Sequence, residues 1–260
     1  MRRSLPLVLS LALFVLIPPS ASSQQPGPLR LAWDQCQTNG GTTHATFACQ
    51  TNTGRPYTLI ASIVLPVDIP QFAAASVFIH AYVGGIGRAA WWQTALGECR
   101  VNAIGMSFDP QNLAESGCPN IWEGHSNAEV FLVQTLGDHP YVLRLSGGAA
   151  VPVGSQFPLV ADGSELVIAR LTIARAKSTG PGACEGCANK VCFAFVESRL
   201  QQPAGLGDYW FYWDYFGGSE AYANYSQSPS FGPANTPEPC GGGWVAGLNR
   251  TWGAIKTMYR

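Results

Sequence analysis

Residues 165–174, ELVIARLTIA, are the stretch that decides the fold. Side chains alternate between two faces in a β-strand, so every second residue shares a face. One face of this stretch is wholly apolar and consists of Val167, Ala169, Leu171 and Ile173. The other face becomes polar towards its end, at Arg170 and Thr172. This pattern is typical of a strand in a sheet that faces a core on one side and water on the other.

The rest of the chain repeats short runs rich in β-branched and aromatic residues, separated by Gly, Pro, Asn and Asp. Turns are expected at 137–140 (GDHP) and 161–164 (ADGS), and short helices at 89–100 and 112–117. Besides 165–174, strands are expected at 29–33, 57–65, 76–83, 101–108, 129–135, 140–146, 191–199 and 209–216. About nine strands without long helices predict an all-β, two-sheet antiparallel sandwich, of jelly-roll or cohesin-like type and stapled by disulfides.

The N-terminus has the three regions of a secretory signal peptide. Arg2 and Arg3 precede the apolar run LPLVLSLALFVLI, and PPSASS then offers small residues for cleavage after Ser23. An uncleaved membrane anchor is the alternative. We therefore expect a secreted or cell-surface protein, with a signal peptide at 1–23, a β-sandwich domain at 24–226, and an irregular C-terminal segment at 227–260. No later apolar run predicts a membrane span.

Charge excludes one class of partner. Removing 1–23 takes away two arginines, so 13 basic residues remain against 16 acidic ones, a net charge of about −3. Charged residues make up 12% of the chain, against about 25% in an average domain. Without a basic stripe, nucleic-acid binding is not expected.

Three of the eight cysteines lie within ACEGCANKVC, residues 183–192. Zinc binding would need about four ligands, but a second Cys-x-x-Cys pair is missing and the four histidines are scattered. A thioredoxin-like redox site would need a strand-to-helix turn, whereas this cluster leads into a strand. In an oxidising compartment, structural disulfides are favoured, and no metal or other cofactor is expected. The cysteines are Cys36, Cys49, Cys99, Cys118, Cys184, Cys187, Cys192 and Cys240.

The simplest disulfide pairing is local. It joins Cys36 to Cys49 and Cys99 to Cys118, and it leaves the cluster at 183–192 together with Cys240. One thiol of the cluster would then reach Cys240, and the other two would close a small loop. Eight cysteines allow 105 pairings, so this pattern is a preference among many.

The stretch DYWFYWDYFGG, residues 208–218, carries the densest chemistry, since seven of the eight residues 209–216 are aromatic. A strand would place Tyr209, Phe211, Trp213 and Tyr215 on one face, and Trp210, Tyr212, Asp214 and Phe216 on the other. Three interpretations are open: a strand buried on both faces, a protein contact, and a platform that stacks on sugar rings. The candidate ligand-binding residues are Trp210, Tyr212, Trp213 and Tyr215, with Trp91 and Trp92.

Trp91, Trp92 and Trp122 form a second aromatic set around the expected Cys99–Cys118 disulfide. Such a loop would bring the three tryptophans near one another. Packing around the disulfide is the alternative to ligand binding at this place.

No motif for a familiar enzyme class occurs: His-Glu-x-x-His, Gly-x-Ser-x-Gly, a Walker loop and a dinucleotide-binding glycine motif are all missing. A glycoside hydrolase would need two carboxylates across a cleft. The acids near the aromatic strand are Glu197, Asp208, Asp214 and Glu220. We therefore name no catalytic residue.

The last eleven residues, RTWGAIKTMYR (250–260), are basic and weakly amphipathic. They predict a recognition tag for export or surface attachment, with a docked helix or a frayed tail as alternatives. The tag residues are Trp252, Ile255, Lys256, Tyr259 and Arg260.

Several of these stretches resemble a group of uncharacterised secreted proteins from uncultivated bacteria. The matching stretches are LAWDQC, FACQTNTG, WWQ ahead of a cysteine, GACEGCANKVC and the terminal TWGAIKTMYR. The resemblance implies secretion and a shared terminal tag, and it implies no activity. The strand pattern is also similar to cohesin-like and carbohydrate-binding sandwiches, a likeness of fold only.

The expected function is that of a secreted, non-catalytic binding, surface or assembly protein whose partner is a glycan or another surface protein. The alternatives are a carbohydrate-binding module that uses the aromatics of 209–216, and a glycoside hydrolase. Nothing in the sequence fixes an oligomeric state.

Overall fold

The computed structural model describes residues 28–83, 88–122, 124–125, 127–136, 139–213 and 219–225, together with Cys240. The expected signal peptide at 1–23, the tag at 250–260 and both Asp214 and Tyr215 lie outside these residues.

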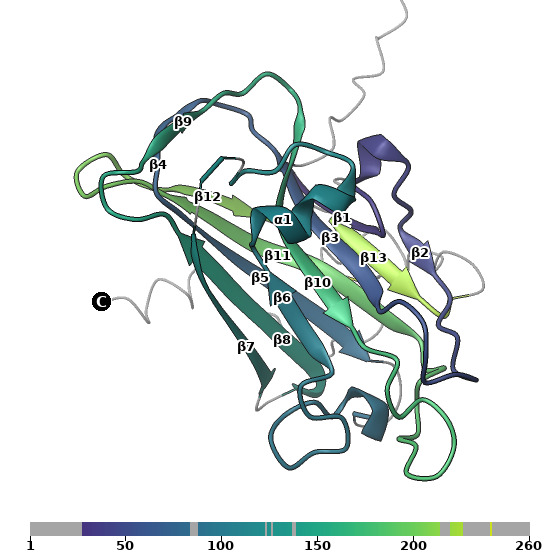
Figure 1. The fold of residues 1–260 in the computed structure, drawn as a ribbon. Helices are drawn as coiled ribbons and strands as arrows, with labels where there is room; N and C mark the ends of the chain where they lie inside the picture. Colours follow the sequence, from purple (N-terminus) through teal and green to yellow (C-terminus); the bar gives the residue numbers. More distant parts are fainter. Residues whose placement is uncertain are drawn as a thin grey trace, which may run out of the picture.

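Two β-sheets pack face to face and enclose the core (Figure 1). The smaller sheet has the order β1 (Leu29–Trp33), β3 (Tyr57–Val64), β10 (Glu165–Ile173) and β6 (Ile104–Ser107). The larger has the order β2 (His44–Ala45), β13 (Glu220–Ala223), β11 (Val191–Gln201), β5 (Ala74–Val83), β8 (His139–Ala150) and β7 (Ala128–Leu136), with β12 (Tyr209–Tyr212) also paired to β11. β4 (Ile69–Phe72) and β9 (Phe157–Leu159) form a separate small sheet.

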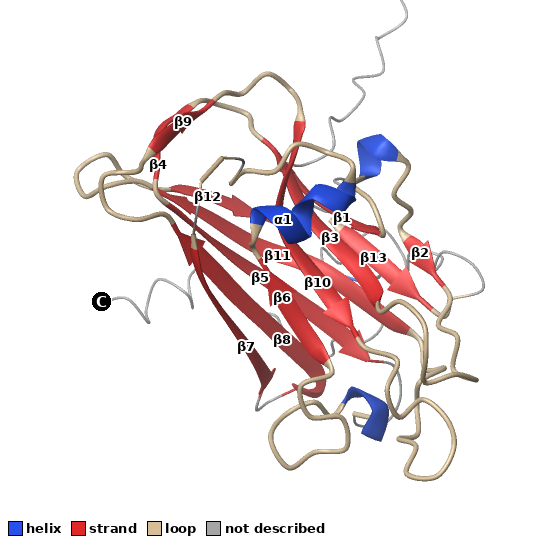
Figure 2. Ribbon diagram, viewed as in Figure 1, coloured by secondary structure: helices blue, strands red, loops and turns tan. Residues whose placement is uncertain are grey.

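Helix is scarce (Figure 2). The helical turns are η1 (Gln37–Asn39), η2 (Ala90–Trp92), α1 (Pro110–Leu113) and η3 (Ala114–Ser116). α1 begins at the N-cap Asp109, whose side chain accepts the Gln111 amide at 2.9 Å, with a proline at the first helical position. The helix expected at 89–100 is present only as the turn η2, and the one expected at 112–117 corresponds to the end of α1 followed by η3.

The two-sheet antiparallel sandwich is confirmed, and every ladder in the described residues is antiparallel except β2–β13. Eight of the nine expected strands are present within a few residues, and β1 agrees at both ends. Of the strand expected at 209–216, β12 covers Tyr209–Tyr212, and residues 214–216 lie outside the described part of the chain. The expected strand count was too low, because thirteen strands occur in the part of the chain described. The four additional strands, β2, β4, β9 and β13, have two to four residues each, too few to show an alternating pattern.

The core between the sheets is unusually aromatic. Trp33 on β1 packs edge-on against both Phe47 and Phe193, with ring centroids 5.6 Å apart in each pair. Trp91 and Trp92 are fully buried beside them, with centroids 4.9 Å apart. Burying a large apolar side chain contributes roughly 1.5–3 kcal/mol, so this cluster is a principal source of stability.

A β-bulge in β11 decides which of its residues face the core. The pairing of β11 with β5 shifts between Phe195 and Glu197, so Val196 is the extra residue. Phe193 and Phe195 before the bulge are buried in the main core. The bulge reverses the alternation, and Glu197 and Arg199 therefore point away from the core.

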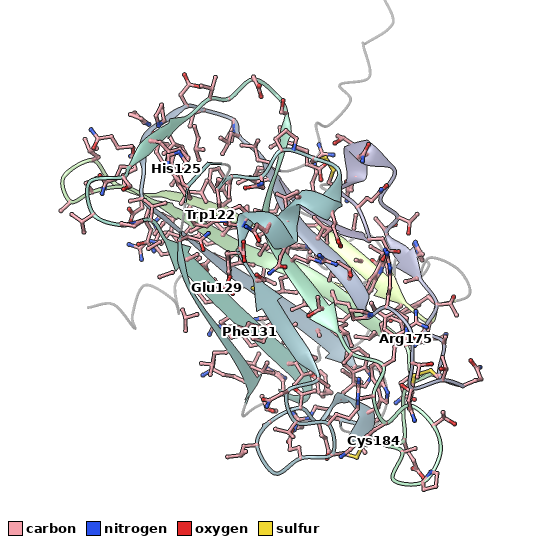
Figure 3. The ribbon with its side chains drawn as sticks, in the orientation of Figure 1. Trp122, His125, Glu129, Phe131, Arg175 and Cys184 are labelled. Carbon is pink, nitrogen blue, oxygen red and sulfur yellow. A yellow bond between two sulfur atoms is a disulfide. The ribbon has the colours of Figure 1, made fainter. Side chains whose placement is uncertain are left out.

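Four disulfides link all eight cysteines, as expected, but the local pairing is wrong. The bonds are Cys36–Cys118, Cys49–Cys187, Cys99–Cys184 and Cys192–Cys240. One thiol of the 183–192 cluster does reach Cys240, whereas the other two bind distant partners and close no small loop. Cys184 lies among the loops at one end of the sandwich (Figure 3), where chain segments far apart in sequence meet.

Candidate functional site

The outward face of the larger sheet brings charged and aromatic side chains from four strands together. Across β12, β11 and β5, one row consists of Tyr212, Glu197 and Phe78. The next row consists of Trp210, Arg199 and Ser76. Arg144 on β8 adds a guanidinium 4.7 Å from the ring centroid of Phe78. We name the set Phe78, Arg144, Glu197, Arg199, Trp210 and Tyr212 the outer aromatic face.

Trp210 and Tyr212 are the exposed aromatic residues of this face. Their exposed fractions are 46% and 52%, whereas Phe211 between them is buried in the main core. The expected alternation of β12 is thus confirmed, and a strand buried on both faces is excluded for these residues. The buried Phe211 anchors β12 and leaves its two neighbours directed to solvent.

The two exposed rings share an orientation. Their planes differ by 11° and their centroids lie 6.3 Å apart. Two residues along a strand span about 6.6 Å, so each ring keeps its own position along β12. The two rings form a stacked pair within the range of about 4.5–7 Å for aromatic contacts, and each is about half exposed.

Arg199 and Asp208 hold the indole of Trp210 in place. The Arg199 guanidinium carbon lies 4.6 Å from the Trp210 ring centroid, a cation–π contact. Arg199 donates through Nε, at 2.9 Å, and through Nη2 to the same Asp208 oxygen. The other Asp208 oxygen accepts the Gln202 amide at 3.2 Å. These contacts link Trp210, Arg199, Asp208 and Gln202 into one connected group on this face.

Burial perturbs two titratable groups on the same side of the sheet. Desolvation raises the pKa of the Glu197 carboxyl, and the positive charges of Arg144 and Arg199 oppose this shift. Desolvation, with a further contribution from Arg144, lowers the pKa of His80 to about 4. His80 is therefore neutral at neutral pH, whereas for Glu197 the effect of burial exceeds that of its two arginine neighbours and the pKa of the carboxyl is raised.

The remaining sequence-predicted residues do not join the face. Trp91 and Trp92 have no exposed surface, so the expectation that they contact a ligand is wrong. Trp91 instead donates its indole N–H to Ser178 Oγ at 3.0 Å, and its amide to the Glu185 carbonyl next to Cys184. Packing around a disulfide is the correct alternative, although the disulfide is Cys99–Cys184.

Trp122 lies apart from that pair. It packs against Phe72 and Phe108, at centroid distances of 5.0 and 6.2 Å, and its indole donates to the Ile168 carbonyl (Figure 3). The expected gathering of three tryptophans is wrong, because Cys99 does not bond to Cys118.

Trp213 follows β12 and packs on a second apolar cluster on the outward side of the larger sheet. The expectation that Trp213 shares the face of Phe211 is therefore wrong, because Phe211 is buried in the main core and Trp213 lies beyond the end of the strand. The second cluster includes both cysteines of the Cys192–Cys240 disulfide. The bond therefore attaches Cys240 beside the outer aromatic face. Sequence reasoning missed Phe78, although its alternation with the buried Val77 and Ile79 was a usable signal.

The acids considered for glycoside cleavage have other partners. Asp208 is bound to Arg199 and Gln202, as described above. Glu220 accepts the Tyr222 hydroxyl and, at 2.6 Å, the Cys240 amide. Asp214 lies outside the described residues. No pair of unengaged carboxylates therefore emerges from Glu197, Asp208 and Glu220.

One group in the described residues has the composition of a metal site. Ligand atoms of Cys36, Cys118 and Glu165 lie within 4.8 Å of one another. The two sulfurs are bonded to each other, so neither is a thiolate ligand. Glu165 accepts the backbone amides of Gln37 and Thr38, at 3.1 and 2.8 Å, which gives it a structural role.

No protein-family model matches the chain, and no curated protein matches it. Within the described residues, no helix is both long and apolar enough to cross a membrane. Four disulfides are typical of proteins outside the cytoplasm.

Proposed function

We propose that this chain is a secreted, non-catalytic binding protein that takes glycans on its outer aromatic face. The exposed, parallel rings of Trp210 and Tyr212 are the observation that carries the proposal. Aromatic rings stack on the apolar faces of sugars, and nearby charged groups accept and donate hydrogen bonds to sugar hydroxyls. Arg199, Asp208 and Glu197 supply such groups beside the rings.

The size of the platform favours a sugar over a large protein partner. A stable protein interface buries about 800 Å² on each side and has an apolar centre. Here two exposed rings stand among charged side chains, which suits a ligand of a few sugar units. An aromatic pair fixed by Arg199 also loses little conformational entropy on binding.

A glycan array on the oxidised, full-length chain tests the proposal. We expect binding to one class of oligosaccharide, reduced at least tenfold by Trp210→Ala and further by adding Tyr212→Ala. Leu96→Ala is the matched control, because Leu96 is 94% exposed and lies in the loop that carries Cys99 rather than on the outer aromatic face. An array without binding, or equal binding by the aromatic variants, would refute the proposal. If the chain instead binds a protein, and Trp210→Ala abolishes that binding, the ligand of the outer aromatic face is a protein and not a glycan.

A further inference from the structure

A groove of about 1100 Å³ lies against the smaller sheet, and the outer aromatic face belongs to the larger one. Its floor includes Thr58 and Ile60 of β3 and Arg170 of β10, where Arg170 pairs in register with Ile60. Asp34, after β1, and Glu115 of η3 contribute acidic groups to its lining. A cavity of this size is comparable to a small-molecule site.

The three arginines of the groove differ in how their charge is balanced. Arg170 forms an ion pair with Glu115 at 3.0 Å and donates to the Asn112 carbonyl at 2.8 Å. Arg55 is exposed at the rim. Arg175 forms no ion pair with any residue that the structure describes, and its buried Nε has no hydrogen-bond partner there. A guanidinium left in this state is a ready partner for an anion.

Arg175 is also held in a defined position. Its guanidinium carbon lies 4.6 Å from the ring centroid of Tyr57. Tyr57 in turn stacks on the buried ring of Phe47, at 4.0 Å and 19°. The Cys49–Cys187 disulfide fixes the chain between those two rings. Figure 3 shows Arg175 close to the loops at that end of the sandwich.

Gly54 has no side chain, and this leaves room for the guanidinium of Arg175. A Cβ built on Gly54 would lie 3.2 Å from Nη1 of Arg175, and the backbone there has a φ of 109°, which favours glycine. The loop is thus shaped around the arginine. A guanidinium fixed in this way matches a carboxylate better than a mobile surface lysine would.

The rest of the groove lining suits hydroxyl groups. Asp34 is exposed and has a φ of 64°, a conformation that asparagine and aspartate adopt more readily than most residues. Its backbone amide donates to the Thr58 carbonyl at 2.9 Å, which fixes the backbone from which the carboxylate extends. A carboxylate there repels a second anion but accepts hydroxyl protons, so it favours a ligand with one acidic group and several hydroxyls.

We propose that this groove is a second binding site, which takes a hydroxylated carboxylate of the uronic-acid class with its carboxylate on Arg175. Arg55 adds positive charge at the rim, and Asp34 accepts ligand hydroxyls. The site is separate from the glycan platform proposed above and does not depend on it, because the two sites share no residue, although His44 and Ala45 of β2 in the larger sheet also line the groove.

Titration calorimetry of the oxidised, full-length chain with D-glucuronate tests the site, with D-glucose and inorganic sulfate as comparison probes. We expect saturable binding of glucuronate, weaker binding of sulfate and none of glucose. Arg175→Gln should weaken glucuronate binding at least tenfold, because a charge-assisted interaction is lost. Arg30→Gln is the matched control, because Arg30 is a cation on the same sheet, on β1, outside the groove lining.

Arg55→Gln provides a second variant that leaves folding intact, because its side chain is exposed, and it should weaken binding several-fold. Asp34→Asn should weaken glucuronate binding but not sulfate binding. Absence of glucuronate binding, or unchanged affinity in Arg175→Gln, would overturn the site. Equal affinity for sulfate and glucuronate would overturn the ligand class. None of these outcomes depends on Trp210 or Tyr212, so the two proposals fail separately.

Discussion

The guanidinium of Arg199 lies against the indole of Trp210, and the same arginine is bound to Asp208. The ion pair is partly exposed, so its contribution to folding is small, roughly 0.2–1 kcal/mol. Its larger effect is on the position of the indole. We therefore expect Arg199→Gln to leave the melting temperature nearly unchanged while weakening any ligand that stacks on Trp210.

Iodide quenching of tryptophan fluorescence checks the exposure on which that expectation rests. Trp33, Trp91, Trp92 and Trp122 are buried and should be protected from iodide. Trp210→Phe should remove a quenchable component from the spectrum. If the quenching of this variant equals that of the unsubstituted chain, the indole is covered and the platform does not exist.

The disulfide pattern gives a second prediction. Peptide mapping without reduction should find Cys49 linked to Cys187 and Cys36 linked to Cys118, across sequence separations of 138 and 82 residues. Removing a native disulfide of a secreted domain costs about 2–5 kcal/mol, so Cys36→Ser with Cys118→Ser should lower the melting temperature clearly. A peptide that joins Cys36 to Cys49 would contradict the structure.

The strand pattern was predictable because it is local, whereas the cysteine pairing was not. The alternation is visible in the residues themselves, and β10 follows it from Ala169 to Ile173, with Arg170 and Thr172 only half-buried. A register shift between Val167 and Ala169 interrupts it, so Val167, which pairs with Ser62, does not share the face of Ala169, which pairs with Ala61, and that part of the expectation is wrong. Which loops meet at one end of a sandwich depends on strand order. Cys49 precedes β3 and Cys187 precedes β11, and only the assembled sheets bring these two ends together.

The candidate site was half predictable for a similar reason. The alternation of β12 identified Trp210 and Tyr212 as one face, but nothing local says that the strand lies at a sheet edge with that face uncovered. The position of Arg199 on this face was harder to predict. Without the bulge at Val196, simple alternation would place Arg199 on the same face as Phe193 and Phe195, in the core.

His80 predicts that stability depends on pH. Its pKa is lowered from 6.5 to about 4, first by burial and then by Arg144, and Tyr82 Oη lies 3.5 Å from its Nδ1. Between pH 6.5 and about 4 the unfolded chain binds a proton that the folded chain does not, so stability falls as the pH is lowered through this window. The loss from this residue amounts to about 3 kcal/mol at its end.

Urea unfolding at pH 7 and pH 4 measures that loss. His80→Gln cannot titrate, so its stability should fall less than that of the unsubstituted chain over the same interval. Carboxyl groups such as Glu197 titrate in both proteins, so their contributions to the loss of stability cancel in the comparison. Equal losses in the two proteins would show that His80 is not kept neutral by the fold.

Arg100 makes the most specific prediction about the core. It is almost completely buried, and its guanidinium stacks on Trp91 at 3.5 Å. It donates to the carbonyls of Trp91 and Ala176, each at 2.9 Å, and to that of Ala174. These three carbonyls lie in segments outside the strand ladders. The hydrogen bonds from the arginine therefore take the place of the backbone hydrogen bonds that a ladder would supply.

Arg100→Met keeps the aliphatic stem but leaves the buried Trp91 carbonyl and the part-buried carbonyls of Ala174 and Ala176 without this donor, which should cost about 3 kcal/mol of unfolding free energy. Arg100→Lys should recover only part of this loss, because one ammonium cannot match a planar fork of donors. Lys177→Met is the control, since Lys177 donates to the Cys99 carbonyl from an exposed position and should cost less than about 1 kcal/mol. Denaturant unfolding of the three variants checks this order of stability losses. If Arg100→Met is as stable as the unsubstituted chain, the carbonyls find other donors. The guanidinium would then not hold this end of the sandwich together.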